Sequence, residues 1–355
     1  MIVLFTSNIS GGVLQFVAQI LRELVDLEYD VVAFIPKIAN VTIESRIERR
    51  VIRYDKVKTI NSQNKHIKEL ADEIMKYKPA LIWYFDNCVV CSEVSSHIQS
   101  VPEMIIMHDA GTSHSTNMNS IMHRFRSSFE HYMSRKLEKK CKRIMLLSDE
   151  SKKTYLKIRP QHKDKIVQFN LGAHVPDVEA VRPSQEMPES FYLFFGRIDK
   201  YKGIGRLLKA YHSYKGSTPL VIAGKGTLSE DEKVIANNDG RITLINRYIS
   251  DEEMVWLFDN CRATVLPYTE ATQSGIIPIG YKHGKPAIVS NVPGLSQVVI
   301  DGVTGKVCNT IEDFTKAFGQ FENIDMKTSC KKYYDEKMNW KNNINKLFSE
   351  IGVTR

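Results

Sequence analysis

Two short segments carry the side chains best suited to hold a phosphorylated ligand. The segment FFGRIDKYKG, residues 194–203, places Arg197 and Lys202 in one loop after an apolar run. Two cations there can clamp a diphosphate, because the arginine fork makes bidentate contacts with phosphate oxygens. A solvated basic loop is the alternative. The strand pattern before this loop and the helix pattern after it favour a ligand site.

The second segment, TEATQSG, precedes an apolar stretch that is typical of a buried helix. Phosphates settle at helix N-termini, where unpaired N–H groups and the positive end of the helix dipole are exposed. Gln273, Ser274 and Gly275 would open this helix, and Gly275 would let a ligand approach the backbone closely. Glu270 cannot bind phosphate, but it can accept hydrogen bonds from sugar hydroxyls. A plain helix cap is the alternative, and it would account for Ser274 alone.

Hydrophobic periodicity places these segments in an α/β chain with two doubly wound, Rossmann-like domains facing across a cleft. Helical patterns alternate with strand-type runs, which in the first half are IVLFTS, DVVAFIP, ALIWYF, EMIIMHD and RIMLLS. In the second half the strand-type runs are FYLFFG, PLVIAG, RITLINR, ATVLPY and PAIVS. Residues 174–190 are rich in proline and acidic residues and lack periodicity, which indicates a linker. We predict an N-terminal domain over 1–173, a second domain over 191–330 and a C-terminal helix within 331–355.

Loops that follow strands are the expected ligand sites, because ligands of open parallel sheets bind at the carboxyl ends of the strands. These loops are 8–12, 108–114, 196–202, 224–227 and 268–275. In HDAGTSHS, His108 follows an apolar strand and points a polar group at the cleft, and Asp109 and His114 are weaker candidates. A structural histidine is the alternative.

The chain has 355 residues and a formal net charge of +8, which favours an anionic partner such as a nucleotide or a phospholipid surface. Lysine and arginine crowd between residues 131 and 165, where a basic face could rest on anionic lipid or simply be solvated. No apolar run reaches the roughly 18 residues of a membrane span, and the first residues do not resemble a signal peptide. We expect a cytoplasmic protein that is free or peripheral on the inner face of the cell membrane.

The six cysteines include one C-x-x-C pair, Cys88 and Cys91. No second pair follows and no histidine stands at ligand spacing, so we predict neither a zinc site nor another bound metal. A redox pair is the alternative, but FDNCVVCSE lacks the strong strand–helix context that such pairs need. We expect all six thiols to be reduced.

Several spaced motifs together resemble the donor domain of the GT-B glycosyltransferases of family 4, which are retaining enzymes that use sugar nucleotides. The motifs are FFGRIDKYKGIGRLLKAY, IAGKG, YISDEEMVWLFDNCRATVLPY and SGIIPIGYKHGKPAIVSNVPGLSQVVIDGVTG. They cover residues 191–307 in the family's order, whereas the N-terminal half is similar only in layout. The resemblance implies that residues 1–173 bind the acceptor and 191–330 the donor. It also implies that Trp340 leads into a last helix that crosses back to the first domain.

The resemblance implies a donor pocket as well. Arg197 and Lys202 would bind the diphosphate and stabilise the charge that grows on the leaving nucleotide, so no metal is needed. With Glu270, and with His108 on donor hydroxyls, they form the expected catalytic set. The residues implied to bind donor or nucleotide are Gly11, Gly12, Gly196, Gly224, Gly226, Tyr248, Gln273, Ser274 and Gly275. Asn246 and Arg247, beside Tyr248, are equally well explained as strand-end residues.

The chain departs from the family at a pair of glutamates eight positions apart. Counting back from the segment GKP at 284–286 puts Ala271 and Ile279 in their places, with Glu270 one position earlier. The second glutamate grips the nucleotide ribose in the family. Its loss implies that the ribose is held otherwise or that the activity is impaired. A subset of the family shares the QSG start of this helix.

We therefore predict a retaining glycosyltransferase that moves a hexosyl group from a nucleotide sugar, UDP-sugar favoured over GDP-sugar, to a glycan or lipid-linked acceptor. Synthesis of a bacterial surface polysaccharide or glycolipid is the expected setting, and no nucleic acid partner is expected. One alternative is a catalytically impaired partner subunit of the same fold, which the replacement at Ile279 supports. The other is a sugar-nucleotide epimerase, for which the predicted cleft loops hold too few carboxylates.

Overall fold

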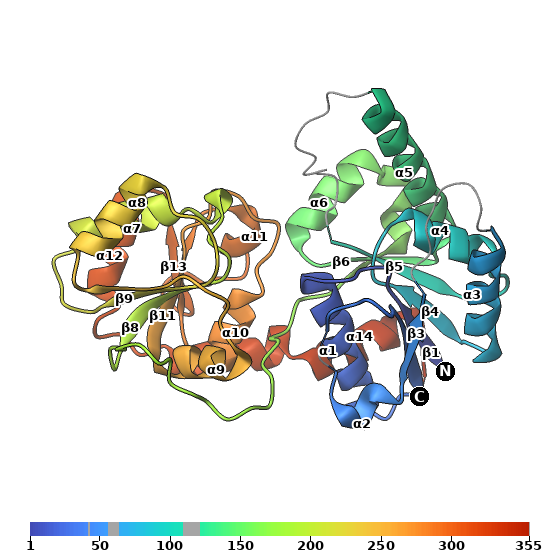
Figure 1. Cartoon of the computed structure of the whole chain (residues 1–355), viewed down its shortest axis with the longest axis horizontal. Coiled ribbons are helices and arrows are strands. Elements are labelled where there is room, and N and C mark those ends of the chain that lie inside the picture. Colours follow the sequence, from blue (N-terminus) through green and yellow to red (C-terminus); the bar gives the residue numbers. More distant parts are fainter. Residues whose placement is uncertain (42, 56–63, 109–120, 355) are drawn as a thin grey trace. The chain divides into compact units, whose positions relative to one another are not determined.

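The computed structural model describes residues 1–41, 43–55, 64–108 and 121–354, and they form two compact units (Figure 1). Unit 1 comprises Met1–Phe169 together with the residues from Asn343 onward, and unit 2 is Asn170–Asn342. Each unit contains one parallel sheet with helices on both faces. The predicted α/β class with two doubly wound domains is confirmed.

Unit 1 is built on a seven-stranded sheet in the order β3-β2-β1-β4-β5-β6-β7, and all its strand pairs are parallel. Helices α1, α2 and α14 lie on one face of the sheet and α3, α4 and α5 on the other (Figure 1). Its elements are β1 (Ile2–Phe5), α1 (Gly12–Asp26), β2 (Val31–Pro36), α2 (Ser45–Glu48), β3 (Val51–Tyr54), α3 (Asn64–Lys76), β4 (Leu81–Tyr84), α4 (Val89–Ser96), β5 (Glu103–Met107), α5 (Ile121–Lys140), β6 (Arg143–Leu146), α6 (Asp149–Ile158), the 3-10 turn Pro160–Lys165 and β7 (Ile166–Gln168).

Unit 2 is built on a six-stranded parallel sheet in the order β10-β9-β8-β11-β12-β13. Helices α7, α8 and α12 cover one face, and α9 and α10 cover the other (Figure 1). Its elements are β8 (Phe191–Phe195), the 3-10 turn Lys200–Lys202, α7 (Ile204–Ser213), β9 (Leu220–Ala223), α8 (Glu230–Asn238), β10 (Ile242–Ile245), α9 (Asp251–Asn260), β11 (Cys261–Leu266), α10 (Ile276–Lys282), β12 (Ala287–Ser290), α11 (Pro293–Ser296), β13 (Gly305–Cys308), α12 (Ile311–Gln320), α13 (Lys327–Tyr333), the π-helical turn Tyr334–Met338 and α14 (Trp340–Ile351), which continues into unit 1.

The central strands are apolar along their whole length because a parallel sheet with helices on both faces buries both sides of each strand. Strands β1, β4 and β9 are buried at every position. Each sheet reverses its winding once, between β1 and β4 in unit 1 and between β8 and β11 in unit 2. Ligands of such sheets bind beside the loops at these switch points.

The segment 174–190, predicted as a linker, packs with unit 2. Met187 belongs to the hydrophobic core of that unit, and Val175 packs against the same core. The guanidinium of Arg182 lies 5.4 Å from the ring centroid of Trp256. Buried apolar side chains therefore hold residues 174–190 against unit 2, although the composition of this segment alone indicates a linker.

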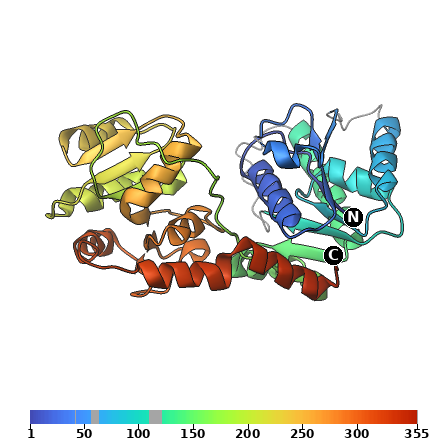
Figure 2. The same ribbon diagram turned by 90° about the horizontal axis from the view of Figure 1, so that it is seen from below.

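The final helix is shared between the two units. Trp340 Nε1 donates a hydrogen bond of 2.8 Å to the carbonyl of Ala173 in unit 2. Further along, the Phe348 ring contacts Tyr29 at a centroid distance of 4.9 Å and Trp83 at 6.2 Å, both in unit 1. Figure 2 shows α14 as one continuous helix. It thus begins among unit 2 residues and ends among unit 1 residues.

Candidate functional site

Two predicted loops meet at the switch point of the unit 2 sheet. The loop after β8 carries Arg197 and Lys202, and the loop after β11 carries Glu270. Thr269 joins them, because its backbone N–H and its hydroxyl both donate to the carbonyl of Tyr201, at 2.8 and 3.2 Å. The two segments that the sequence analysis singled out are therefore neighbours in space.

Lys202 is held against aromatic rings and removed from most of the solvent. Its Nζ lies 3.8 Å from the ring centroid of Tyr268 and 5.1 Å from that of Tyr201. The pKa of Lys202 is lowered to about 8, mainly by burial and then by the nearby charge of Arg197, with Asp199 acting in the opposite direction. Among the described carboxylates, none forms an ion pair with Lys202. Lys202 is thus a partly desolvated cation without an ion-pair partner in the described part of the chain.

Arg197 lies at the outer side of the same loop. Its side chain is 75% exposed, and its guanidinium forms an ion pair of 3.3 Å with Asp199. An exposed pair of this kind contributes little to stability and exchanges readily for a stronger anionic partner. Arg197 is therefore available to an anion that also reaches Lys202.

The predicted glycines bring the loops close together. Gly196 and Gly224 have φ of 122° and 145°, which side chains rarely adopt, and a Cβ on Gly224 would lie 2.0 Å from the carbonyl oxygen of Gly196. A Cβ on Gly226 would lie 2.3 Å from the carbonyl oxygen of Ile198. These glycines pack the backbone of one loop against the next, and their contact with a ligand stays a prediction.

The loop after β11 leaves its polar groups in contrasting environments. Glu270 is exposed and forms no hydrogen bond or ion pair among the described residues. Oε1 of Gln273 is buried, and no described group donates to it. Ser274 Oγ accepts a hydrogen bond of 3.2 Å from the N–H of Ile276, the first residue of α10. Gly275, the N-cap residue of α10, has open space around its Cβ position.

Ala271 and Ile279, which stand at the positions of the two family glutamates, both pack into unit 2. Ile279 is buried with 6% exposure and belongs to the core of unit 2. Ala271 is half-buried against the same core, and its carbonyl accepts a hydrogen bond of 3.1 Å from Gly294. Neither position faces the solvent as Glu270 does, so Glu270 is the carboxylate that this loop offers.

Of the three residues 246–248, the first two form hydrogen bonds with other loops or helices of unit 2, and the third is exposed. Asn246 Oδ1 accepts from the N–H of Gly226 at 3.0 Å, and its Nδ2 donates back to the Gly226 carbonyl at 3.1 Å. Arg247 forms two bonds of 2.6 Å with the carboxylate of Glu253 on α9. Both are therefore strand-end residues with structural roles, whereas the Tyr248 side chain is 77% exposed.

In unit 1, His108 lies at the carboxyl end of β5. Its Nε2 donates to the carbonyl of Phe85 at 3.0 Å, and its ring meets the Phe16 ring edge to face at 5.9 Å. Phe16 lies one turn into α1, the helix that Gly11 caps and Gly12 begins. His108 and the two glycines thus share the carboxyl edge of the unit 1 sheet. The weaker candidates Asp109 and His114 lie outside the described residues.

The aromatic ring that lies against Lys202 was not predicted from the sequence. Tyr268 lies two residues after the buried end of β11, and Lys202 lies against its ring, which is 1% exposed. An aromatic residue at the end of a strand, next to a loop rich in polar residues, is the signal that could have revealed it.

The basic stretch between residues 131 and 165 is partly neutralised by its own contacts. Lys140 pairs with the buried carboxylate of Glu103 at 2.8 Å, and Lys165 donates to the carbonyl of Lys139 at 2.6 Å. Lys140 is therefore engaged within unit 1. No helix in the described part of the chain is both long and apolar enough to cross a membrane.

Residues 178–340 match the protein family described as "Glycosyl transferases group 1". This match covers most of unit 2. It contains both loops of the switch point and the whole β8–β13 sheet.

Curated and solved relatives extend the comparison. The chain is 40% identical over 78 residues to the alpha-1,3/1,6-mannosyltransferase of Dictyostelium discoideum, a stretch that covers 21% of this chain and 18% of that protein. The chain thus spans only a small part of that curated relative. The lipopolysaccharide outer core galactosyltransferase WaaB, in its apo form, matches with a TM-score of 0.69 at 15% identity over 99% of this chain and 100% of that chain. Anabaena HepE in complex with UDP-glucose matches with a TM-score of 0.69 at 12% identity and the same coverages. With the group 1 domain, these structures identify the fold as GT-B.

Proposed function

We propose that the protein is a retaining glycosyltransferase that transfers a hexosyl group from a nucleotide sugar, with a UDP-sugar as the favoured donor. The observation that carries the proposal is the position of Lys202. It is a half-buried lysine with no carboxylate partner among the described residues, and it lies in the same loop as Arg197 at the switch point of the sheet that the group 1 family model matches. A diphosphate supplies the counter-charge that Lys202 lacks among the described residues, and it can replace Asp199 as the partner of Arg197.

The proposed chemistry needs charge stabilisation more than it needs a protein base. As the bond between the sugar and the diphosphate breaks, negative charge grows on the leaving phosphate, and Lys202 and Arg197 stabilise it. Groups of this kind contribute roughly 3–4 kcal/mol each to transition-state stabilisation. The leaving phosphate then takes the acceptor proton, with attack from the face it leaves. No metal is required on this view.

Glu270 is proposed to accept hydrogen bonds from hydroxyls of the donor sugar. It is exposed next to the loop that holds Lys202, and it has no competing partner among the described residues. The exposed ring of Tyr248 is proposed to stack against the nucleotide base. The contact of His108 with the donor sugar stays a prediction from family resemblance.

A UDP-sugar is favoured because the similar HepE structure contains UDP-glucose. We also propose a hexosyl donor, a glycan or lipid-linked acceptor, and a role in surface polysaccharide or glycolipid synthesis. The names of the similar transferases support these three proposals. A panel of UDP-, GDP- and ADP-sugars tests the donor by thermal stabilisation. A ligand at 100 times its Kd adds about 2.7 kcal/mol to the stability of the native state. Stabilisation by none of the panel would contradict the proposal.

One observation favours a second candidate, a partner subunit of the same fold without transferase activity. Ile279 replaces the second family glutamate and is buried in the core, so this helix offers no carboxylate to a ribose. Whether or not such a subunit binds nucleotide sugar, it would release no nucleoside diphosphate. Measuring nucleoside diphosphate release with mixed glycan and lipid-linked acceptors separates the two candidates.

We also propose that unit 1 rests on anionic lipid through one face of α5. Phe129 and Tyr132 are 47% and 65% exposed, and Lys136 and Lys139 are exposed one and two turns further along. Residues at these spacings share a helix face. Exposed aromatic rings beside lysines suit a membrane interface, where rings enter the headgroup region and cations meet anionic lipid. We call these four residues the α5 face.

A further inference from the structure

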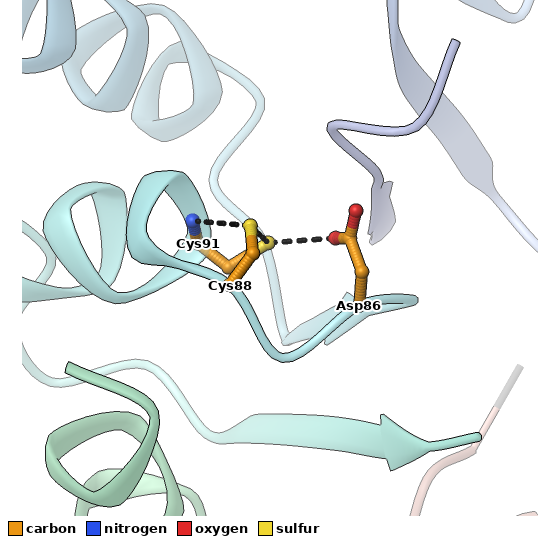
Figure 3. Close-up of side chains that lie close together, drawn as sticks. All are labelled: Asp86, Cys88 and Cys91. Atoms are coloured by element: carbon orange, nitrogen blue, oxygen red, sulfur yellow. Dashed lines mark hydrogen bonds between the residues drawn. The ribbon is translucent and has the colours of Figure 1, made fainter. Parts of the chain in front are cut away.

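The switch point of the unit 1 sheet holds a group of ligating atoms that the proposed donor site does not use. Asp86 and Cys88 come from the loop after β4, and Cys91 comes from the first turn of α4. One ligand atom of each lies within 4.8 Å of the others (Figure 3). Cys91 Sγ donates to Asp86 Oδ1 at 2.8 Å, and the two sulfur atoms are 3.5 Å apart.

The Asp86 carboxylate is held in a fixed orientation by the loop after β1. Its Oδ2 accepts hydrogen bonds from the N–H of Ser7 at 3.0 Å, the hydroxyl of Ser7 at 2.8 Å and Nδ2 of Asn8 at 2.7 Å. Oδ1 is left to face the thiols. Carboxylates that bind metals are oriented in this way by outer hydrogen bonds to the oxygen that does not bind the metal.

The charges around the group call for a cation. Asp86 forms no ion pair with any described lysine, arginine or histidine, and its contacts are to neutral donors. Cys91 is fully buried beside Asp86 and Cys88. A carboxylate and two thiols thus converge, and no positive charge in the described structure compensates them.

We propose that Asp86 Oδ1, Cys88 Sγ and Cys91 Sγ bind one thiophilic divalent cation, with Zn²⁺ as the ion that fits best. Zinc binds sulfur at about 2.3 Å and carboxylate oxygen at about 2.0–2.2 Å in tetrahedral geometry. Two thiolates of such a site lie about 3.8 Å apart by that geometry, close to the 3.5 Å seen here. On binding, each thiol releases its proton to solvent and gains a metal–sulfur bond. Cys88 is only half-buried, so a water molecule can complete the fourth position.

The ion would connect two loops of the same sheet edge. Ser7 Oγ lies 3.1 Å from Cys88 Sγ, and the chain runs on from Ser7 to Gly11 at the start of α1. Fixing Cys88 and Asp86 on one ion would therefore also fix the loop that leads into this helix. The role is structural, and none of the three ligands is assigned to the transfer reaction.

Cobalt is the probe for this site, because Co²⁺ bound by thiolates gives a charge-transfer absorption band. Titration of the reduced, full-length protein is expected to produce this band and to saturate at one ion per chain, with Zn²⁺ abolishing it by displacement. C88S and C91S should each lose the band. D86N and N8A should keep a weaker band, with affinity lowered by at least about 10-fold. C141A is the matched control, because Cys141 is an equally buried thiol of unit 1, and it should titrate like the wild type.

Two outcomes would overturn the proposal. The first is the absence of a thiolate–cobalt band in the reduced wild-type protein, a result that does not depend on the folding of any variant. The second is a band that survives in both C88S and C91S. If the reduced protein binds no Co²⁺ but glutathione disulfide links Cys88 to Cys91, as mass spectrometry of the alkylated protein would show, the pair is a redox pair. Transferase activity enters none of these readouts, so the result is independent of the proposed function.

Discussion

Lys202 should make nucleotide binding depend on pH. Its pKa in the free protein is lowered to about 8, and a bound diphosphate would favour the protonated form, so binding above that pH must take up a proton. We expect affinity for UDP to fall by up to about 10-fold per pH unit above pH 8 and to be level below it. Burial raises the pKa of Tyr268, whose ring contacts Lys202, so this phenol stays neutral in the same range.

Calorimetric titrations with UDP between pH 7 and 10, in buffers of different ionisation enthalpy, measure both the affinity and the proton uptake. K202R keeps the charge throughout this range and is the control that should remove the pH dependence. A wild-type affinity that stays constant up to pH 10 would show that Lys202 does not contact the nucleotide.

Glu270 allows a test of the loop register. If it holds a hydroxyl of the donor sugar, E270Q should lower turnover of the nucleotide sugar and leave the Kd of the free nucleoside diphosphate unchanged. Equal losses in both would place Glu270 on the nucleotide. No loss in either would mean that the register of this loop does not deliver Glu270 to the donor.

The residues near the site differ in how far their roles can be predicted from the sequence. Arg197 and Lys202 could be predicted, because cations after a strand are a recognisable pattern. The roles of Asn246 and Arg247 could not be decided, because each depends on a partner from another loop or helix, Gly226 and Glu253. A polar residue at a strand end looks the same in sequence whether a neighbour occupies it or a ligand does.

At the scale of elements, strands in the middle of each sheet were predicted and most edge strands were not. The predicted runs correspond to β1, β2, β4, β5 and β6 in unit 1 and to β8–β12 in unit 2. The missing strands β3, β7 and β13 each lie at a sheet edge. An edge strand has one open side, so its sequence tolerates polar residues such as Arg53 and Lys306 that interrupt an apolar run. Only centrally buried strands leave a continuous hydrophobic signal.

The close packing of the unit 2 loops gives a prediction for two glycines. G224A would force a Cβ to 2.0 Å from the Gly196 carbonyl oxygen, at a φ of 145°. We expect it to lower the free energy of unfolding by at least about 1–3 kcal/mol, the cost of such backbone strain. G275A is the matched control, because Gly275 has a φ of −74° and open space at its Cβ position.

Urea unfolding of both variants measures the difference. G275A should unfold like the wild type and yet bind UDP more weakly, because a methyl group would stand where a ligand is proposed to approach the backbone. If G224A proves as stable as G275A, the loops pack less tightly than described. If G275A binds UDP normally, the N-terminus of α10 is not part of the donor site.

At the scale of the whole molecule, topology explains what the sequence could not indicate. Sheet order brings the loop after β1 beside the loop after β4, which are separated by some eighty residues, and so places Ser7 and Asn8 on Asp86. The spacing D-x-C-x-x-C was visible in the sequence. Only the two cysteines were considered as ligands, because nothing in the sequence shows that the Asp86 carboxylate is turned toward the thiols.

The α5 face predicts attachment to anionic membranes. The protein should co-sediment with vesicles that contain anionic lipid, bind neutral vesicles more weakly, and lose binding as salt screens the charges over about 8 Å at physiological ionic strength. K136E with K139E should release it. K209E with K215E changes the net charge equally at exposed positions of unit 2 and should leave binding intact. Attachment that ignores salt would point to an apolar anchor, and no attachment would leave the face merely solvated.

The central claim is that Lys202 and Arg197 bind the diphosphate of a nucleotide sugar, and calorimetric titration of UDP at pH 7 tests it most directly. We expect K202A to weaken binding by about 10- to 100-fold, as for loss of a hydrogen bond to a charged group. R197A should weaken it less, because Arg197 is exposed and paired with Asp199. K209A, at an exposed position of α7, should bind like the wild type. Equal affinities for the wild type and K202A would contradict the account.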